Sequence, residues 1–284
     1  MVEGEIKNVT ISQSCGKWFV AIQTEREAAT PTPNGDMVGI DVGIARFATL
    51  SDGSFYEPRN SFKTLESALR KAQQAMSRKV KFSNNWKKAK AKVQRIHAKI
   101  GNSRRDYLHK TSSDISKNHA IVCIEDLQVK NMSKSATGTM EQRGRNVRAK
   151  SGLNKAILNV GWHKIETYTG YKAYASGKAV FKIPAPKTSQ ECAKCGHTHP
   201  DNRKTQALFV CGHCGHTDNA DHNASLVIKK GGIHLILDTG TVLSDDGVLR
   251  TQSDSGRGGN RKTGRAKSST SSAQRSVKKE KLAA

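Results

Sequence analysis

Four cysteines in the last third of the chain have the spacing of metal ligands. They form two C-x-x-C pairs separated by fifteen residues: Cys192, Cys195, Cys211 and Cys214. Four thiolates in two such pairs suit tetrahedral Zn²⁺, because each pair turns back on itself and brings both sulfurs to one metal. Gly196 and Gly215 each follow the second cysteine of a pair, where a tight turn needs positive φ. The pattern favours one structural zinc ion over disulfides or chance spacing. Nearby histidines could substitute as ligands, but four cysteines already complete the site.

Three acidic residues occur where elements of a folded core are expected to begin or end. Asp41 lies in the apolar segment 37–50, Glu125 ends the apolar segment 119–127, and Asp221 falls in the first turn of an expected helix that begins near residue 218. Each has an ordinary explanation when taken alone. A strand-end carboxylate can point into solvent, and Asp218 and Asp221 can favour a helix N-terminus through the macrodipole.

Taken together, the three acids indicate a different chemistry. Carboxylates supplied by two strands and one helix start, next to a strongly basic surface, are what two-metal phosphodiester hydrolysis requires. Such a site would hold two Mg²⁺ or Mn²⁺ ions about 4 Å apart. Because close carboxylates repel one another, we expect the site to be poorly formed without cations.

Hydrophobic patterning predicts the elements that would position these residues. Alternating apolar residues predict a β-hairpin over 7–13 and 17–24, followed by a linker over 25–35. Two strands joined tightly through Gly43 are expected over 37–50, and buried strands over 119–127 and 179–183. We expect a mobile basic loop over 129–151 and a helix over 153–174.

The C-terminal part of the pattern starts with the helix that carries Asp221. Asp218 is its expected N-cap, Ala220, Ala224 and Val227/Ile228 its inner face, and Gly231–Gly232 its expected end. The apolar run 234–237 is a candidate strand, and residues 252–284 should be disordered.

The segment 63–110 is unusually basic. It contains fifteen Lys and Arg residues, opposed only by Glu66 and Asp106. Apolar residues at helical spacing predict two long helices, with a break and a new cap at residues 83–85. Ordinary solvated helix faces mix both signs, so a face of nearly one sign favours a track for a phosphate backbone.

The whole chain shares this charge. The 284 residues carry a formal net charge of +24 and a pI near 10.0. Nucleic acid is the default partner of such an excess, and an anionic membrane surface is the weaker alternative. We expect no membrane partner and a cytosolic protein, because there is neither a run of eighteen apolar residues nor a signal-peptide core at the N-terminus. Cys15 and Cys123 are left over as buried or free thiols.

The order of these motifs resembles one known family. Five segments, in this order, resemble the transposon-encoded OrfB/TnpB proteins: G-I-D-V-G at 39–43, the basic helical pair, V-C-I-E-D-L at 122–127, the two C-x-x-C pairs, and N-A-D-x-N-A-S at 219–225. The resemblance implies an α/β fold: an RNase H-like (RuvC-like) mixed sheet with a long inserted helical hairpin and an inserted zinc ribbon. By family role, Asp41, Glu125 and Asp221 match the three metal-binding catalytic acids, and the four cysteines match the zinc ligands. Arg203 lies where a basic residue is common, and no chemistry is assigned to it.

The resemblance also implies a division of the chain. Residues 1–30 would be a hairpin remaining from a wedge domain, 35–188 the first part of the nuclease domain, 189–216 the zinc ribbon, 217–232 the last nuclease helix and 233–284 a basic tail. The rest of the wedge and recognition region would be absent because of a truncated gene, an alternative start or a separate partner chain.

The activity implied is that of a Mg²⁺-dependent, RNA-guided DNA endonuclease associated with transposition, in the cytoplasm and nucleoid of a prokaryote. Its partners would be DNA and a guide RNA. One alternative is a nuclease-inactive or truncated nucleic-acid-binding remnant or repressor of the same family. A zinc-ribbon transcription or ribosome-associated factor would account for the charge and the cysteines, but not for the three acids.

Overall fold

The computed structural model describes residues 4–25, 27, 36–239, 242–243 and 249–250. The chain divides into two units, Met1–Gln252 and Ser253–Ala284, and every described element belongs to the first. The tail expected to be disordered, 252–284, and nearly all of the expected linker 25–35 lie outside the described residues. Within the described part, no helix is both long and apolar enough to span a membrane.

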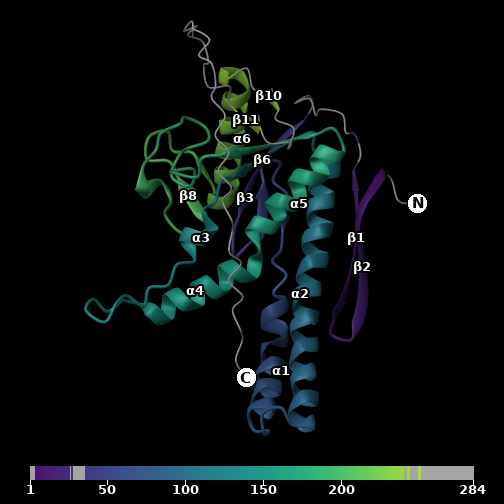
Figure 1. The fold of residues 1–284 in the computed structure, drawn as a ribbon. Helices are drawn as coiled ribbons and strands as arrows, with labels where there is room; N and C mark the ends of the chain where they lie inside the picture. The colour runs from purple at the N-terminus through teal and green to yellow at the C-terminus, as the bar shows by residue number, and fades with distance from the viewer. Residues whose placement is uncertain (1–3, 26, 28–35, 240–241, 244–248, 251–284) are drawn as a thin grey trace, which may run out of the picture. The chain divides into compact units, whose positions relative to one another are not determined.

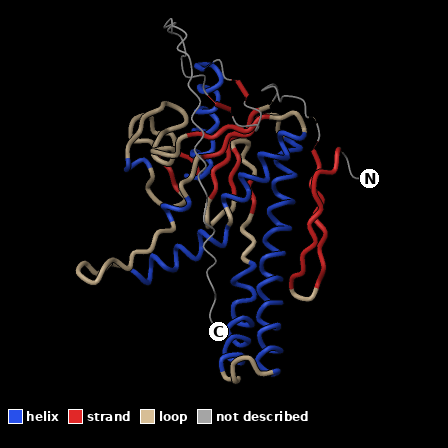
Figure 2. The backbone as a smooth tube through the Cα atoms, in the orientation of Figure 1, coloured by secondary structure: helices blue, strands red, loops and turns tan. Residues whose placement is uncertain are grey.

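A five-stranded mixed sheet forms the centre of the first unit (Figures 1 and 2). Its strand order is β5-β4-β3-β6-β7. The strands are β3 (Met37–Val42), β4 (Ala48–Leu50), β5 (Phe55–Tyr56), β6 (Ile121–Glu125) and β7 (Ala179–Ile183). β3, β4 and β5 pair antiparallel, whereas β6 is parallel to both β3 and β7. The expected combination of a mixed sheet with helices is therefore present, and β7 has the predicted bounds.

Helices cover both faces of this sheet. On one face, α2 (Asn84–Asn118) and α5 (Trp162–Ala175) bury a core that includes Val38, Ile40, Leu108 and Ile165. On the other face, Ile228 of α6 (Ala220–Thr239) packs with Ile121, Cys123 and Phe181 of the sheet, all buried. Successive strand residues point to opposite faces, so the even-numbered residues of β3 face α2 and α5 while Gly39 and Asp41 face α6.

The prediction that α6 ends at Gly231–Gly232 is wrong. The helix continues to Thr239, so residues 234–237 are helical and not a strand. The two glycines instead allow α6 to approach the sheet closely. A Cβ at Gly232 would lie 2.2 Å from Cys123 Sγ, and one at Gly231 would lie 2.9 Å from Ile183 Cγ2. The physical reason is packing, because the cost of two helical glycines is offset by contact with the sheet.

The basic segment forms the expected helical pair. α1 (Ser61–Ser77) packs along α2 through Leu69, Ala72, Val93 and Ile100. α2 begins at the predicted break, where the Ser83 side chain accepts a hydrogen bond from the Trp86 amide at 3.2 Å. The C-terminal half of α2 then crosses the sheet, and its Leu108 and Ile115 are completely buried.

Residues 129–175 contain more helix than expected. α3 (Val129–Met132) and the first turn of α4 (Val147–Val160) lie within the predicted loop 129–151. The predicted helix 153–174 is two helices, because Gly161 adopts φ +84° and separates α4 from α5. A side chain at Gly161 would be strained, and its Cβ would lie 3.2 Å from Leu108 Cδ1. The break turns Trp162 into the core, where its indole N–H donates to the Gly43 carbonyl at 3.4 Å.

The remaining elements are short or peripheral. The predicted hairpin is present as β1 (Glu5–Ser14) and β2 (Lys17–Glu25). A 3₁₀ turn (Pro200–Asn202) and the paired strands β8 (Leu208–Val210) and β9 (Thr217–Asn219) surround the cysteines. β10 (Val242–Leu243) pairs with β11 (Leu249–Arg250).

Candidate functional site

Asp41 and Glu125 share one face and one end of the central sheet. β3 and β6 are parallel and in register, with Ile40 opposite Ile124. The next residue of each strand therefore points to the face that α6 covers, as Gly39 and Cys123 do two residues earlier. The two carboxylates predicted from separate apolar segments thus lie on neighbouring strands, 84 residues apart in the chain.

The start of α6 brings Asp221 to the same place. A Cβ at Gly39 would lie only 2.1 Å from the Ser225 carbonyl oxygen, so the helix and strand backbones are in direct contact there. From this contact, Asp41 is two residues along the strand, about 7 Å, and Asp221 is one turn toward the helix N-terminus, about 6 Å. Both steps lead in the same direction, because α6 runs opposite to β3. Gly39 lies beside Ser225, whereas the earlier strand residue Met37 lies beside the later helix residue Gly232.

The electrostatics of Asp41 reflect its proximity to the other two acids. Burial, followed by the negative charges of Glu125 and Asp221, raises the pKa of Asp41 to about 8, although the Arg203 charge acts in the opposite direction. Burial also raises the pKa of Glu125, whereas the Thr188 hydroxyl and Arg203 act to lower it. At neutral pH the site therefore retains a proton on Asp41 or binds a cation that replaces it.

Two residues that sequence reasoning did not assign hold the acids. The buried Thr188 hydroxyl donates to Glu125 Oε1. The Arg203 guanidinium donates to Asp221 Oδ1 at 3.2 Å and to the Gln206 carbonyl at 3.1 Å. The sequence shows a basic residue at Arg203 but does not indicate its role. No sequence pattern marks Thr188, because only the folded chain brings it to the end of β6.

Asp218 is not the N-cap of α6. Asp218 lies in β9, and Asn219 caps the helix instead: its side-chain oxygen accepts hydrogen bonds from the amides of Asp221 and His222. Asparagine caps as well as aspartate does, so a one-residue shift costs little. Asp218 accepts from His222 Nδ1 at 2.8 Å. The acid of this region whose negative charge raises the pKa of Asp41 is Asp221.

The four cysteines form one compact cluster. Their sulfur atoms all lie within 4.8 Å of one another, with Cys192 3.7 Å from Cys214 and Cys195 3.6 Å from Cys211. A tetrahedron of Zn–S bonds of about 2.3 Å has edges of about 3.8 Å, so this set fits zinc. Both pairs turn in the same way, with the Gly196 and Gly215 amides bonded to the carbonyls of Cys192 and Cys211, and both glycines have positive φ.

The cysteine cluster is built into the start of α6. Ala220, the first residue of the helix, packs in one core with Cys192, Phe209 and Cys211. One turn further on, the buried Asn223 side chain accepts from the Ala193 amide at 3.0 Å and donates to the Glu191 carbonyl at 2.7 Å. Asp221 lies between these two attachment points. The elements that hold the cysteines therefore also fix the third acid.

Comparison with known proteins agrees with this arrangement. The OrfB_IS605 family model, described as "Probable transposase", matches residues 19–136, and the Cas12f1-like TNB domain model matches residues 162–228. InsQ of Escherichia coli K12, which bears the name of an RNA-guided DNA endonuclease, is 52% identical over 252 residues. The chain belongs to the OrfB/TnpB family.

The aligned regions differ in extent between this OrfB/TnpB chain and its relatives. The alignment with InsQ covers 88% of this chain and 62% of InsQ. A protein of Streptomyces pristinaespiralis, also named as an RNA-guided DNA endonuclease, is 32% identical over 81% of this chain and 54% of its own length. The chain thus spans little more than half the length of these relatives. Among solved structures, a Cas12f1–sgRNA–target DNA complex aligns with a TM-score of 0.45 at 16% identity, covering 79% of this chain and 56% of that one.

The OrfB/TnpB chain carries its three acids as oxygen donors and its four cysteines as sulfur donors. Among the described residues, only the cysteines form a group whose ligand atoms all lie within 4.8 Å of one another. The three acids are therefore more widely spaced.

Proposed function

We propose that this chain provides the nuclease part of a transposon-associated, RNA-guided DNA endonuclease that cleaves DNA by two-metal phosphodiester hydrolysis. The observation that carries the proposal is the convergence of Asp41, Glu125 and Asp221 from β3, β6 and α6 on one face of the sheet. Family membership supports it, since the relatives that match over most of this chain bear that name.

We infer that the fold is RuvC-like, within the RNase H-like class. Support comes from the mixed sheet, in which three antiparallel strands are followed by two parallel ones. The long α1–α2 pair is inserted between β5 and β6, and the cysteine-bearing segment lies between β7 and α6. Both positions are those expected from the family resemblance.

The three acids are the proposed ligands of the catalytic Mg²⁺ or Mn²⁺ ions. Two bound ions would supply an activated water and stabilise the leaving 3′-oxygen. Asp41 is partly buried and feels the charges of both other acids, so it would be the ligand shared most closely. Thr188 orients the Glu125 carboxylate by its hydrogen bond, and Arg203 neutralises Asp221 from the side of the cysteine segment.

The four cysteines are proposed to bind one structural zinc ion and to make residues 189–216 a zinc ribbon. The fit of their sulfur distances to a tetrahedron supports this assignment. DNA and a guide RNA are the proposed partners, and the basic α1–α2 pair would lie along the phosphate backbone of the duplex that they form.

The test combines RNA identification with cleavage. The chain is expressed together with the DNA that flanks its gene, co-purifying RNA is sequenced, and a matching DNA target is incubated with the complex and Mg²⁺. Cleavage that is lost in Asp41→Asn but kept in Asp52→Asn, a substitution in the exposed β4–β5 turn, supports the proposal. Cleavage unchanged by Asp41→Asn removes it, and specific RNA binding without cleavage supports the non-cutting alternative.

A further inference from the structure

The turn that joins α1 to α2 exposes apolar side chains where a helical hairpin would normally be polar. Val80 retains 80% of its accessible surface and Phe82 retains 58%. Large apolar groups at the tip of a projecting turn lie in water at a cost, unless a partner covers them.

The backbone of this turn holds Phe82 in place. Its φ of +69° lies in the left-handed region, which a bulky residue rarely adopts. The conformation is fixed by the Ser83 amide, which donates to the Val80 carbonyl at 3.1 Å, and by the Ser83 side chain, which caps α2. The turn therefore presents Phe82 at the end of the hairpin, where its side chain is exposed.

Phe82 and Trp86 form a pair of rings flanked by cations. Their centroids are 5.4 Å apart, with an interplanar angle of 59°. The Lys81 ammonium lies 5.1 Å from the Phe82 ring, and the Lys90 ammonium lies 5.1 Å from the Trp86 ring. Aromatic rings that each have an ammonium group over them suit a planar ligand that carries a negative charge beside its own ring.

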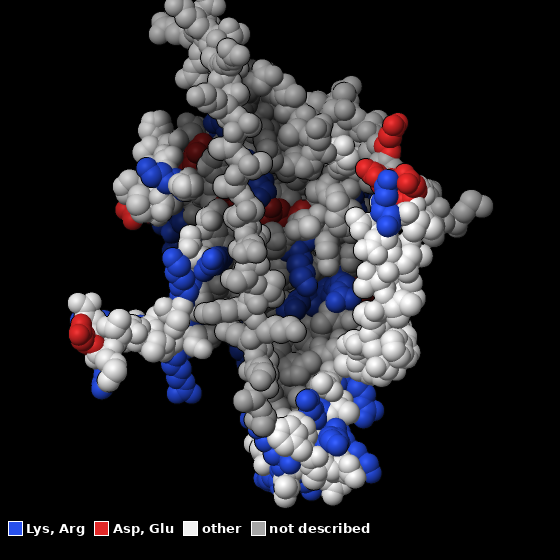
Figure 3. Space-filling model, viewed as in Figure 1, with Lys and Arg blue, Asp and Glu red and all other residues white. Residues whose placement is uncertain are grey.

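The surrounding charge is all of one sign. Between Ser67 and Arg105 there are thirteen Lys and Arg residues and no Asp or Glu. Five of the basic residues lie next to the aromatic pair, and none of them takes part in an ion pair among the described residues: Arg78, Lys79, Lys81, Lys87 and Lys88. Figure 3 shows blue side chains gathered at this end of the molecule.

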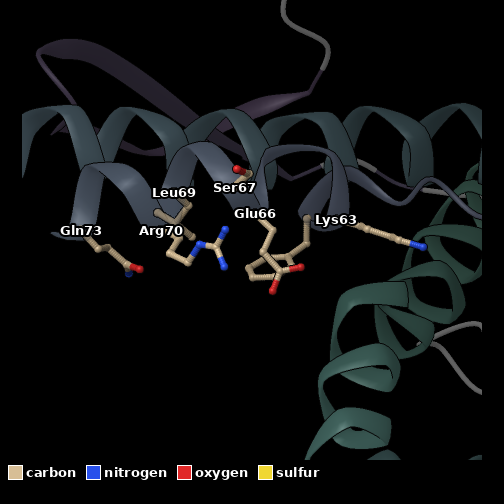
Figure 4. A pocket seen from close by; sticks show the side chains of 7 residues that line it. Lys63, Glu66, Ser67, Leu69, Arg70 and Gln73 are labelled. Atoms are coloured by element: carbon tan, nitrogen blue, oxygen red, sulfur yellow. The ribbon is translucent and has the colours of Figure 1, made fainter. Parts of the chain in front are cut away.

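The positive charge continues along the hairpin away from the tip. On α1, Lys63 and Arg70 line an open hollow of about 450 Å³ (Figure 4), and its one acid, Glu66, is paired with Lys155 of α4. α2 alone has 35 residues, which corresponds to about 50 Å of helix. A charged strip of this length fits a polymer of phosphates better than a membrane plane, which would meet only the tip.

We propose that the tip of the α1–α2 hairpin is a base-stacking platform for nucleic acid. Phe82 and Trp86 stack on unpaired or terminal bases, and the neighbouring Lys and Arg side chains contact the adjoining phosphates. The inference deepens the proposed function, on which it rests for the class of partner. It adds a contact to bases that the charge alone does not predict, because backbone tracking needs no aromatic group.

The test measures binding of the full chain to fluorescein-labelled single-stranded RNA and DNA, and to a small covalently closed circular duplex, which has neither a terminal base pair nor an unpaired base. Phe82→Leu keeps an apolar side chain but removes the ring, and should weaken binding of the single strands about tenfold, in keeping with the loss of one stacked base. Binding of the closed duplex should change little. Val80→Ala, which shortens another exposed apolar side chain of the same turn, is the matched control and should leave both affinities unchanged.

A charge variant separates stacking from phosphate contact. Log affinity falls with log salt, and replacing Lys79, Lys87 and Lys88 together by Gln should reduce the magnitude of that negative slope by about two to three for single strands and duplex alike. Phe82→Leu should leave that slope unchanged. Thermal unfolding of each variant establishes that the hairpin is folded.

Equal binding of single strands by the wild type and Phe82→Leu overturns the proposal. The proposal is also overturned if Phe82→Leu loses binding to anionic phosphatidylserine vesicles while its binding to nucleic acid is unchanged, because that result identifies a membrane contact. The outcome is independent of catalysis, because Asp41→Asn should bind the single-stranded RNA, the single-stranded DNA and the closed duplex as the wild type does. Failure of cleavage with stacking intact removes the nuclease and retains the platform.

Discussion

Asp41→Asn should change how the stability of the protein depends on pH when Mg²⁺ and Mn²⁺ are absent. Burial and the charges of Glu125 and Asp221 raise the pKa of Asp41 to about 8, from the ordinary value of 3.8 that it has in the unfolded chain. Between these two values the folded protein keeps a proton that the unfolded chain has released. The free energy of unfolding therefore falls as pH rises from about 4 to about 8, and is constant with respect to this group outside that window.

The size of the effect follows from the same shift. About four pKa units, at about 1.36 kcal/mol each, correspond to a change on the order of 5 kcal/mol across the window. Asparagine resembles the protonated acid in shape and has no proton to lose. Asp41→Asn should therefore match the wild type near pH 4 and become progressively more stable than it up to pH 8, above which the difference stays constant.

Urea unfolding from pH 4 to pH 9 measures this difference, in buffer freed of Mg²⁺ and Mn²⁺ but supplied with one equivalent of Zn²⁺. Asp52→Asn is the control of opposite sign. Against the effect of burial, hydrogen bonds from Ser54 lower the pKa of Asp52. The Asp52→Asn variant should therefore be less stable than the wild type at neutral pH and equally stable at low pH. Addition of Mg²⁺ at pH 8 should stabilise the wild type and not Asp41→Asn. Parallel pH profiles for the wild type and Asp41→Asn would refute the reasoning.

Three further substitutions test the surroundings of the site. Thr188→Val removes the hydroxyl that holds Glu125 and should weaken Mn²⁺ binding about tenfold by calorimetry, with recovery in Thr188→Ser; equal affinities would contradict that role. Cys192→Ser should lower the zinc content from about one ion per chain and the melting temperature with it, whereas a fully folded zinc-free variant would exclude a structural zinc site. Gly232→Ala places a Cβ 2.2 Å from Cys123 Sγ and should cost about 1–3 kcal/mol in urea unfolding, most of which Cys123→Ala should relieve. Additive effects in that pair would show that the helix and the sheet do not touch there.

The strands and the long helices were predictable because local and tertiary signals agree. β6 is buried on both faces, so the apolar run that contains it needs no alternation to be recognised. β7 is buried at Ala179, Phe181 and Ile183 and exposes Lys182 between them, which is the alternation of a strand with one covered face. The break before α2 was equally clear, since Ser83 both ends the turn and caps the helix. The cysteine spacing predicted the cluster for the same reason, because ligands in two tight turns are a local property.

Predictions failed where a local signal competed with packing. Two adjacent glycines indicate a helix end, yet Gly231 and Gly232 lie mid-helix because β6 and β7 leave no room for a Cβ. Gly161 shows the opposite case, a break that the helical spacing of its neighbours concealed. Thr188 was not predictable at all, since its role depends on a loop returning to the end of β6. The catalytic roles of the three acids remain predictions that the cleavage experiment must test.

The position of Asp221 implies that the two proposed metal sites are coupled. The residue before it packs in the core of the cysteine cluster, and Arg203, which pairs with it, comes from the same segment. Zinc that orders this segment would restrict Asp221 to the position beside Asp41 and so raise the affinity for Mg²⁺. Linkage makes the effect reciprocal, so Mg²⁺ must raise the affinity for zinc by the same factor. Zinc competition with a chromophoric chelator, with and without Mg²⁺, measures that factor. In Asp221→Asn the factor should approach one. Equal zinc affinities of the wild type with and without Mg²⁺ would show that the ribbon and the acids fold independently.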